Sequence, residues 1–179
     1  MIAVTVAVNA APVRGGSQVR ISEGEEWRYF KGTTNPPDKW KQIDFDDRNW
    51  LRGPTGLGYG GSNGTYLDDM RGKYSTVYSR RVFHVNDIYS VTGMTLTIEC
   101  DGAFIAYLNS VEIIRNDAVV KSAPDNPTHA ELLDISGFVH ELLPGNNVLS
   151  VECSNDDINS KDFSFVTVFE ILEYQKDLR

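Results

Sequence analysis

The chain has 179 residues, of which 41% are hydrophobic, enough for one domain with a substantial core. Its 17 basic and 25 acidic residues give a net charge of -8, which disfavours binding to nucleic acid or to an anionic membrane surface. Two cysteines and three histidines are too few for a disulfide framework or for a zinc site built from thiolates and imidazoles.

Residues 1–20 begin with a short apolar run and continue with small residues that include Gly15 and Gly16. The run is far shorter than the roughly 20 apolar residues that span a bilayer. We interpret this segment as a linker or a leading strand, with a signal-peptide remnant as the alternative. The folded domain is expected over residues 21–173, followed by a C-terminal tail over residues 174–179.

Apolar and polar residues alternate with a period of two at least five times along the rest of the chain. This alternation is typical of strands with one face in a core and the other in water. The expected strands cover residues 75–83, 94–100, 104–114, 148–153 and 163–172. Glycine- and aspartate-rich turns separate them at spacings typical of a sandwich, so the sequence predicts an all-β protein.

Three local signals refine this pattern. Asn109 and Ser110 interrupt one strand, which indicates a two-residue hairpin or a kink. Residues 134–143 form the one plausible helical turn, and Pro144 and Gly145 end it. Residues 27–59 are rich in aromatic and turn residues, and we interpret their tryptophans as packing residues.

Several short motifs follow one another in a fixed order. The first half contains Trp27-Arg-Tyr-Phe-Lys-Gly, Phe45-Asp-Asp-Arg-Asn-Trp50, Gly56-Leu-Gly-Tyr-Gly60 and Tyr78-Ser-Arg-Arg-Val-Phe83. The second half contains Asp101-Gly-Ala-Phe-Ile-Ala-Tyr-Leu-Asn109, Asp134-Ile-Ser and Leu143-Pro-Gly-Asn-Asn-Val-Leu149. This order resembles galactose-binding-like domains of large exported bacterial proteins, and the sugar-binding sandwich domain of family 2 glycoside hydrolases. The resemblance implies an antiparallel jelly-roll β-sandwich of about eight strands, an accessory role and an extracellular or cell-surface location.

The candidate ligand site is a long, polar, glycine-rich loop between residues 58 and 80. An exposed aromatic ring can pack on the C–H face of a sugar while neighbouring polar side chains bind its hydroxyl groups. We predict that the ligand-binding residues of this loop and of the next turn at the same end are Tyr59, Tyr66, Asp69, Arg71, Tyr74 and Asp101. Loss of the Tyr66 or Tyr74 ring is expected to weaken binding and leave the melting temperature nearly unchanged. The alternative is a packed or mobile structural loop.

Alternating strand directions give an expectation for the two ends of the sandwich. The loop before Ser75, the turn at residues 100–102 and the connection at residues 137–147 are expected at the ligand end. Residues 84–93, 116–131 and 154–162 are expected at the other end.

The densest group of oxygen ligands is a candidate calcium site, because Ca²⁺ takes six to eight oxygens from loops. Its residues are Asp156, Asp157, Asn159 and Asp162. Galactose-binding-like domains often hold a structural Ca²⁺, so the resemblance raises this expectation. No cofactor is required.

Catalysis has little support in the sequence. Asp46 and Asp47 are adjacent and so point to opposite faces of an extended chain, and an Asx turn ahead of Trp50 explains them better. We therefore predict a non-catalytic carbohydrate-binding module that tethers a larger exported protein to glycan. A structural or protein-interaction module is the alternative, and a small hydrolase comes third. The expected partners are a polysaccharide and other domains of the same polypeptide, without nucleic acid or membrane insertion.

Cys100 and Cys153 each end an expected strand. In the family's sandwich these strands resemble antiparallel neighbours in the larger sheet, which places the two strand ends roughly 15–20 Å apart. A disulfide needs a Cα separation of about 4.4–6.8 Å. We therefore expect two free thiols, and a parallel or shifted strand arrangement is the alternative that brings the cysteines together.

Overall fold

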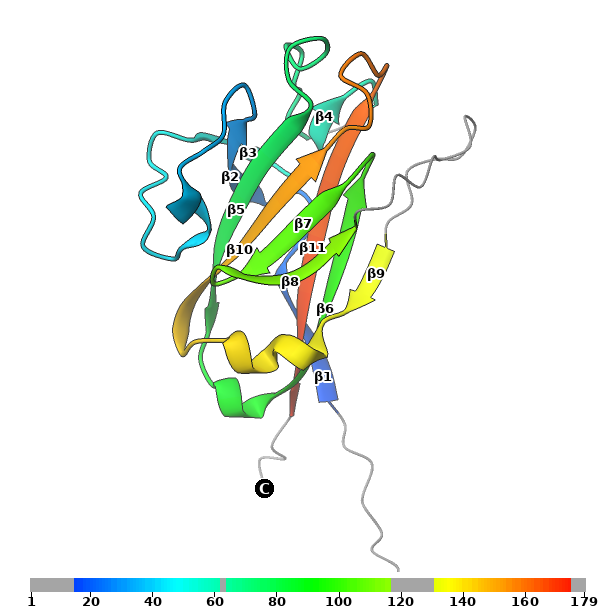
Figure 1. The fold of residues 1–179 in the computed structure, drawn as a ribbon. Helices are drawn as coiled ribbons and strands as arrows, with labels where there is room; N and C mark the ends of the chain where they lie inside the picture. The colour runs from blue at the N-terminus through cyan, green and yellow to red at the C-terminus, as the bar shows by residue number, and fades with distance from the viewer. Residues whose placement is uncertain (1–14, 62–63, 117–130, 175–179) are drawn as a thin grey trace, which may run out of the picture.

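Two antiparallel sheets face each other across one core in the computed structural model, which describes residues 15–61, 64–116 and 131–174 (Figure 1). The five-stranded sheet has the order β1-β11-β6-β9, with β4 also paired to β11. The six-stranded sheet has the order β3-β2-β5-β10-β7-β8. The expected all-β sandwich is confirmed.

The strands expected at residues 75–83, 94–100, 148–153 and 163–172 are found within a few residues of those bounds. The five-stranded sheet contains β1 (Gly15–Ile21), β4 (Leu57–Tyr59), β6 (Val91–Cys100), β9 (Glu131–Asp134) and β11 (Phe163–Tyr174). The six-stranded sheet contains β2 (Glu26–Lys31), β3 (Leu51–Pro54), β5 (Thr76–Val85), β7 (Phe104–Leu108), β8 (Val111–Asn116) and β10 (Gly145–Ser154). The described residues also form three short 3-10 helices, η1 (Asp38–Lys41), η2 (Ile88–Ser90) and η3 (Ser136–Glu141).

The leading segment is partly a strand of the sandwich. β1 pairs with β11 from Gly15 opposite Tyr174 onward. The part of the leading segment from Gly15 onward therefore pairs as a strand of the sandwich. Among the described residues, no helix is both long enough and apolar enough to cross a membrane.

Alternation along β6 and β11 builds the core. Leu96 and Ile98 of β6 are at most 1% exposed, and Phe165 and Phe169 of β11 are fully buried. Burying one such side chain contributes about 1.5–3 kcal/mol. The intervening residues of both strands point to the outer face of the five-stranded sheet.

A second aromatic cluster covers the outer face of the six-stranded sheet. Trp40 of η1 stacks on Trp50 and meets Tyr78 and Tyr107 edge-on. Arg80, which is 2% exposed, holds the covering segment by donating to the carbonyl oxygens of residues 42 and 45 and to the carboxylate of residue 47. The packing role expected for these tryptophans is confirmed.

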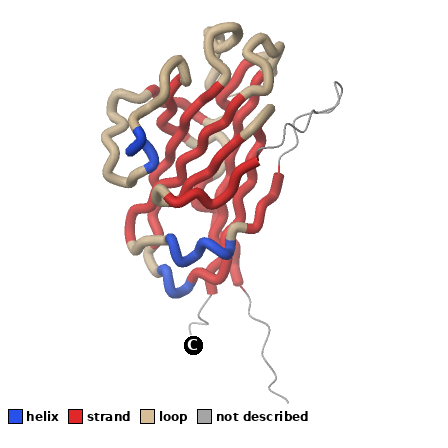
Figure 2. The backbone as a smooth tube through the Cα atoms, viewed as in Figure 1, coloured by secondary structure: helices blue, strands red, loops and turns tan. Residues whose placement is uncertain are grey.

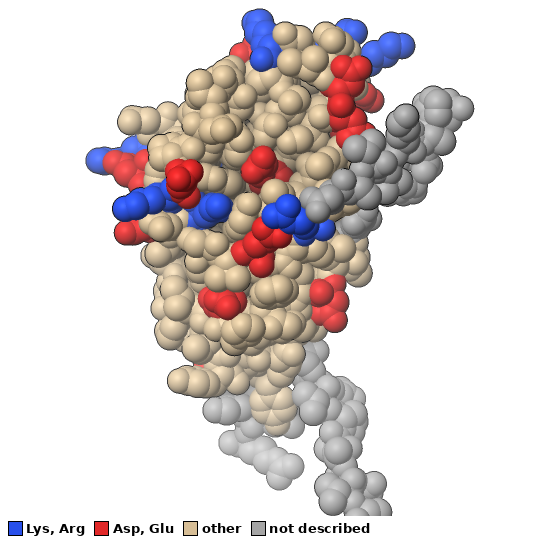
Figure 3. Space-filling view, viewed as in Figure 1, with Lys and Arg blue, Asp and Glu red and all other residues tan. Residues whose placement is uncertain are grey.

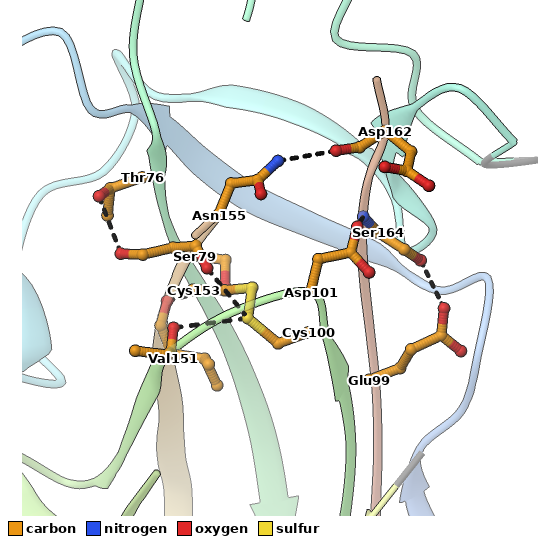
Figure 4. Close-up of a disulfide and its surroundings, with 12 residues drawn as sticks. Thr76, Ser79, Glu99, Cys100, Asp101, Val151, Cys153, Asn155, Asp162 and Ser164 are labelled. Carbon is orange, nitrogen blue, oxygen red and sulfur yellow. Dashed lines mark hydrogen bonds between the residues drawn. A yellow bond between two sulfur atoms is a disulfide. The ribbon is translucent and has the colours of Figure 1, made fainter. Parts of the chain in front are cut away.

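The expectation of free thiols is wrong, because Cys100 and Cys153 form a disulfide with a Cα separation of 6.1 Å. β6 and β10 are not neighbours in one sheet but belong to the two facing sheets. β7 is the next strand after β6, crosses to the other sheet and pairs antiparallel with β10. The chain reverses between β6 and β7, and β10 runs antiparallel to β7, so β6 and β10 run in the same direction. Their C-terminal ends therefore lie at the same end of the sandwich, where the disulfide joins the two sheets (Figure 4).

The same topology corrects the assignment of loops to ends. The loop before β5 and the turn after β6 share one end, as expected, and residues 154–162 join them, because Asn155 N donates to Ser75 O. η3 lies with η2 at the opposite end (Figure 2), so the connection at residues 137–147 is not at the ligand end. Of the loop at residues 116–131, residues 117–130 lie outside the described residues. Its two flanks, Asn116 opposite Phe104 and Glu131 opposite Ile98, are nearer the end with the disulfide.

Candidate functional site

Two adjoining hollows form a groove at the disulfide end of the five-stranded sheet, here called the loop-end groove. Their volumes are ≈ 370 Å³ and ≈ 200 Å³, and they share Gly61, Glu99 and Ser164. The larger hollow is also lined by Glu23, Gly24, Pro54, Thr55, Gly56, Gly64 and Val166. The smaller one is also lined by Tyr59, Gly60, Asp101, Asp162 and Phe163. The groove thus combines residues from five separate parts of the chain.

Glycines make the close approaches of backbone in this region feasible. Gly60 has φ +82, and a Cβ there would lie 2.7 Å from the carbonyl oxygen of Lys161. A Cβ at Gly64 would lie 2.2 Å from the carbonyl oxygen of Thr55. Larger residues would therefore separate the loops that enclose the groove.

A cross-strand row places an aromatic ring beside the groove. Ser164 of β11 lies opposite Gly58 of β4, and Gly58 bridges to Tyr66. Residues directly opposite each other in a sheet point to the same face, so Tyr66 and Ser164 share the outer face with the side-chain-free Gly58 between them. Tyr66 is 64% exposed, so its ring is available to a ligand.

Carboxylates stand on the other side of Ser164. Asp101 accepts a hydrogen bond from Ser164 N at 2.7 Å, and Glu99 accepts one from Ser164 Oγ at 2.5 Å (Figure 4). With Glu23 and Asp162, four carboxylates line the two hollows, and no Lys or Arg is among the described lining residues. Carboxylate oxygens can accept hydrogen bonds from the hydroxyl groups of a sugar.

Tyr59 is a buried residue of the groove that holds a neighbouring loop in place. Its ring is 6% exposed, and its hydroxyl donates to the carbonyl oxygen of Ser160 at 3.1 Å. Burial is the main cause that raises the pKa of Tyr59 above its usual value, so the phenol stays protonated and remains a donor. The hydrogen bond fixes the loop at residues 154–162 beside the groove.

The remaining predicted ligand residues lie elsewhere. Asp69 accepts hydrogen bonds from Lys31 Nζ at 2.7 Å and from Tyr74 Oη at 2.9 Å, and the bond from Lys31 is the main cause that lowers the pKa of Asp69. Tyr74 is 3% exposed, so its ring cannot stack on a ligand. Its replacement would remove a core ring, which contradicts the expectation of an unchanged melting temperature. Arg71 Nε donates to Asn159 O at 3.1 Å and ties two loops together.

Of the predicted ligand residues, Tyr59 and Asp101 line the groove, and Tyr66 lies in the row beside it. Glu23, Glu99 and Ser164 also line the groove and were not predicted. Glu99 and Ser164 are polar, outward-facing residues of two predicted strands. Alternation marks them as exposed but does not show that β6 and β11 are neighbours. Only their pairing, with Val166 opposite Glu99, brings these side chains together.

The predicted calcium residues mostly bind their own loop. Asp157 Oδ1 accepts from Asn159 N at 2.8 Å, and Asp162 Oδ1 accepts from Ser160 Oγ at 3.1 Å. Within the described parts of the chain, no group of three or more His, Cys, Asp or Glu side chains could hold a metal ion. Asp156, Asp157 and Asp162 are therefore not such a group. Calcium binding stays a prediction, which loss of thermal stability in EDTA would test.

Comparison with known proteins gives the fold a context. No family model and no curated protein matches the chain. A β-glucuronidase from glycoside hydrolase family 2 aligns over 89% of this chain and 18% of its own, with 12% identity and a TM-score of 0.59. A family 2 member from Bacteroides cellulosilyticus aligns over 87% and 20%, with 15% identity and a TM-score of 0.57. The Bifidobacterium dentium β-glucuronidase complexed with coumarin-3-O-glucuronide aligns over 87% and 30%, with 15% identity and a TM-score of 0.55.

The chain spans between 18% and 30% of the length of these three solved chains. The aligned part covers nearly all of this sandwich and a minor part of each hydrolase. The chain therefore has the fold of a β-sandwich portion of family 2 glycoside hydrolases.

Proposed function

We propose that this chain is a non-catalytic carbohydrate-binding domain of a larger protein similar to family 2 glycoside hydrolases, and that it binds glycan in the loop-end groove. The observation that carries the proposal is the exposed ring of Tyr66 in one cross-strand row with Ser164, beside the carboxylates of Glu99 and Asp101. An apolar ring face next to fixed hydrogen-bond acceptors is the combination that sugars require.

The dimensions of the groove support this proposal. Ligand pockets are commonly about 300–1,000 Å³, and the larger hollow reaches ≈ 370 Å³ by itself. The acceptors are held in place by Ser164, so binding would not require the carboxylates to lose much conformational freedom. The domain would tether its parent protein to a polysaccharide.

The domain's surroundings are also part of the proposal. The matched hydrolases are several times longer than this chain, which supports other domains of the same polypeptide as partners. A disulfide forms and persists mainly in oxidising compartments, so the Cys100–Cys153 bond supports export to the cell surface or beyond.

Affinity electrophoresis in gels that contain individual polysaccharides tests the proposal. Tyr66→Ala should weaken retention on the bound polysaccharide by roughly 5- to 150-fold, because loss of a contact ring costs about 1–3 kcal/mol. Tyr89→Ala is the matched control, since Tyr89 is 92% exposed but belongs to η2 at the opposite end. Equal retention of the two variants would contradict binding at the groove.

A structural or protein-interaction role is the second candidate. It is favoured by large apolar side chains on the surface, such as Leu132, which is 71% exposed and lies opposite Thr97 on the outer face of the five-stranded sheet. No retention by any polysaccharide in a broad panel would favour this role over sugar binding.

A further inference from the structure

A second hollow lies on the opposite sheet, at the point where β2 separates from β5. The ladder between these strands runs from Lys31 opposite Val77 to Arg28 opposite Arg80, and it ends there in the described register. Glu26 and Trp27 continue along β3 alone. A hollow of ≈ 240 Å³ occupies this fork, lined by Glu26, Trp27, Arg28, Asp47, Arg52, Arg80, Arg81 and Val82.

Arginines gather around the hollow in a protein whose net charge is -8. Four guanidinium groups line it against the carboxylates of Glu26 and Asp47. Glu25 pairs with Arg81 at 2.7 Å, and Asp44 interacts electrostatically with Arg80, so nearby carboxylates balance the arginines. The hollow nevertheless offers guanidinium donors to a small anion in a chain that as a whole repels anions.

Three of the arginines form one cross-strand row. Arg28 lies directly opposite Arg52 on β3 and directly opposite Arg80 on β5. Like charges directly opposite each other destabilise a sheet unless a counter-charge lies between them. Asp47 pairs with Arg28 and Arg80, whereas Arg52 has Glu26 at 3.6 Å and a side chain that is 56% exposed. The row is therefore accessible to solvent at Arg52 and closed at Arg80.

Three residues that line the hollow also carry a buried hydrogen-bond donor without a partner in the described part of the chain. The lining residues Trp27, Arg80 and Arg81 each have one buried nitrogen without a hydrogen-bond partner among the described residues: Trp27 Nε1, Arg80 Nε and Arg81 Nε. Trp27 and Arg80 are at most 2% exposed. These three groups are donors and never acceptors, so they suit an oxygen-rich anion.

We propose that this hollow binds an oxyanion, the carboxylate or sulfate group of a small acid, between the Arg52 and Arg28 guanidinium groups. Planar guanidinium groups hold such oxygens with paired, charge-assisted hydrogen bonds. The anion adds a counter-charge at the exposed Arg52 end of the row, because Asp47 already pairs with Arg28 and Arg80. The site is separate from the loop-end groove and independent of sugar binding there.

Nitrogen-resolved NMR of the full chain tests this site, with sodium sulfate titrated at constant ionic strength. The Trp27 indole signal and the arginine Nε signals should shift and saturate at millimolar sulfate, while the Trp40 indole signal stays in place. Arg52→Gln should weaken sulfate binding by roughly tenfold, because one charge-assisted contact is lost. Arg48→Gln is the matched control, since Arg48 is 82% exposed and pairs with Asp46 outside the hollow.

Two further titrations distinguish an acidic sugar from a free oxyanion as the ligand. Galacturonate and sulfated monosaccharides are compared with free acetate and sulfate in the same titration. Tighter binding of the sugar acids assigns the site to acidic sugars, and equal binding assigns it to free oxyanions; both support the site. An unshifted Trp27 signal, equal shifts of all indole signals, or unchanged sulfate affinity in Arg52→Gln would overturn it.

Discussion

Glu152 shows how one residue can set the response of this sandwich to pH. It points to the outer face of the six-stranded sheet, opposite Tyr78 on β5 and Ile105 on β7. That face carries side chains of both charges (Figure 3). Burial is the largest cause and raises the pKa of Glu152, and the opposing effects of Lys41 and Arg115 do not cancel it. The folded state therefore favours the protonated form of Glu152 more than the unfolded chain does.

In the wild type, ionisation of Glu152 should lower the free energy of unfolding as the pH rises, and we expect Glu152→Gln to remove this loss. A carboxyl group whose pKa is raised by folding contributes stability below its unfolded pKa of about 4.3, and this contribution is lost as pH rises through the folded value. Urea unfolding of wild type and Glu152→Gln from about pH 3.5, below the unfolded pKa, to about pH 7, above it, measures the difference.

Glu112→Gln is the control with the opposite sign. A hydrogen bond from Arg115 is the main cause that lowers the pKa of Glu112, so its contribution is lost as pH falls. Parallel stability curves for wild type and Glu152→Gln would contradict the role of Glu152.

The β7–β8 hairpin shows how an element is specified by its turn. Asn109 and Ser110 have φ values of 50 and 80, the left-handed conformations that a two-residue turn of this kind requires. Asn109 suits this turn, because its side chain also donates to Glu141 O at 2.9 Å and accepts from Val148 N at 2.9 Å. Ser110 has a Cβ in a conformation that favours glycine.

Ser110→Gly should therefore stabilise the protein by about 0.5–1 kcal/mol, since relief of the left-handed strain exceeds the added chain entropy. Thermal unfolding should show a higher melting temperature. Asn109→Gly is the comparison, and it should destabilise, because it removes the side-chain hydrogen bonds to Glu141, Asn147 and Val148. A lower melting temperature for Ser110→Gly would contradict the proposed strain.

At the scale of the whole molecule, the disulfide joins the two sheets at the end that carries the loop-end groove. It links positions separated by 53 residues, between β6 in one sheet and β10 in the other. Asp101 follows Cys100 directly and holds Ser164 at 2.7 Å. The turn after β6 thus carries both a cysteine of the disulfide and a carboxylate of the groove.

Replacing both cysteines by serine should lower the free energy of unfolding by about 2–4 kcal/mol, because the unfolded chain regains the freedom that the cross-link removed. Urea unfolding of the oxidised wild type and the double variant measures this loss. Alkylation of the unfolded, unreduced wild type should label neither thiol. Two labelled thiols, or equal stability of the two proteins, would contradict the bond.

The sequence by itself determined the local elements, because period-two alternation and turn residues act between near neighbours in the chain. It predicted β5, β6, β10 and β11 within a few residues, and the turn at Asn109 and Ser110. The exposed Tyr66 also carried a local signal, in a polar, glycine-rich loop.

Only the tertiary structure decided which sheet each strand joins, since an alternating strand fits the inner face of either sheet equally well. That choice placed β6 and β7, consecutive in the chain, in opposite sheets. It brought Cys100 to Cys153, Glu99 to Ser164, and Arg52 to Arg28. The disulfide, the groove and the arginine row all depend on pairing between distant segments, and no local pattern encodes that pairing because it depends on how the whole core is filled.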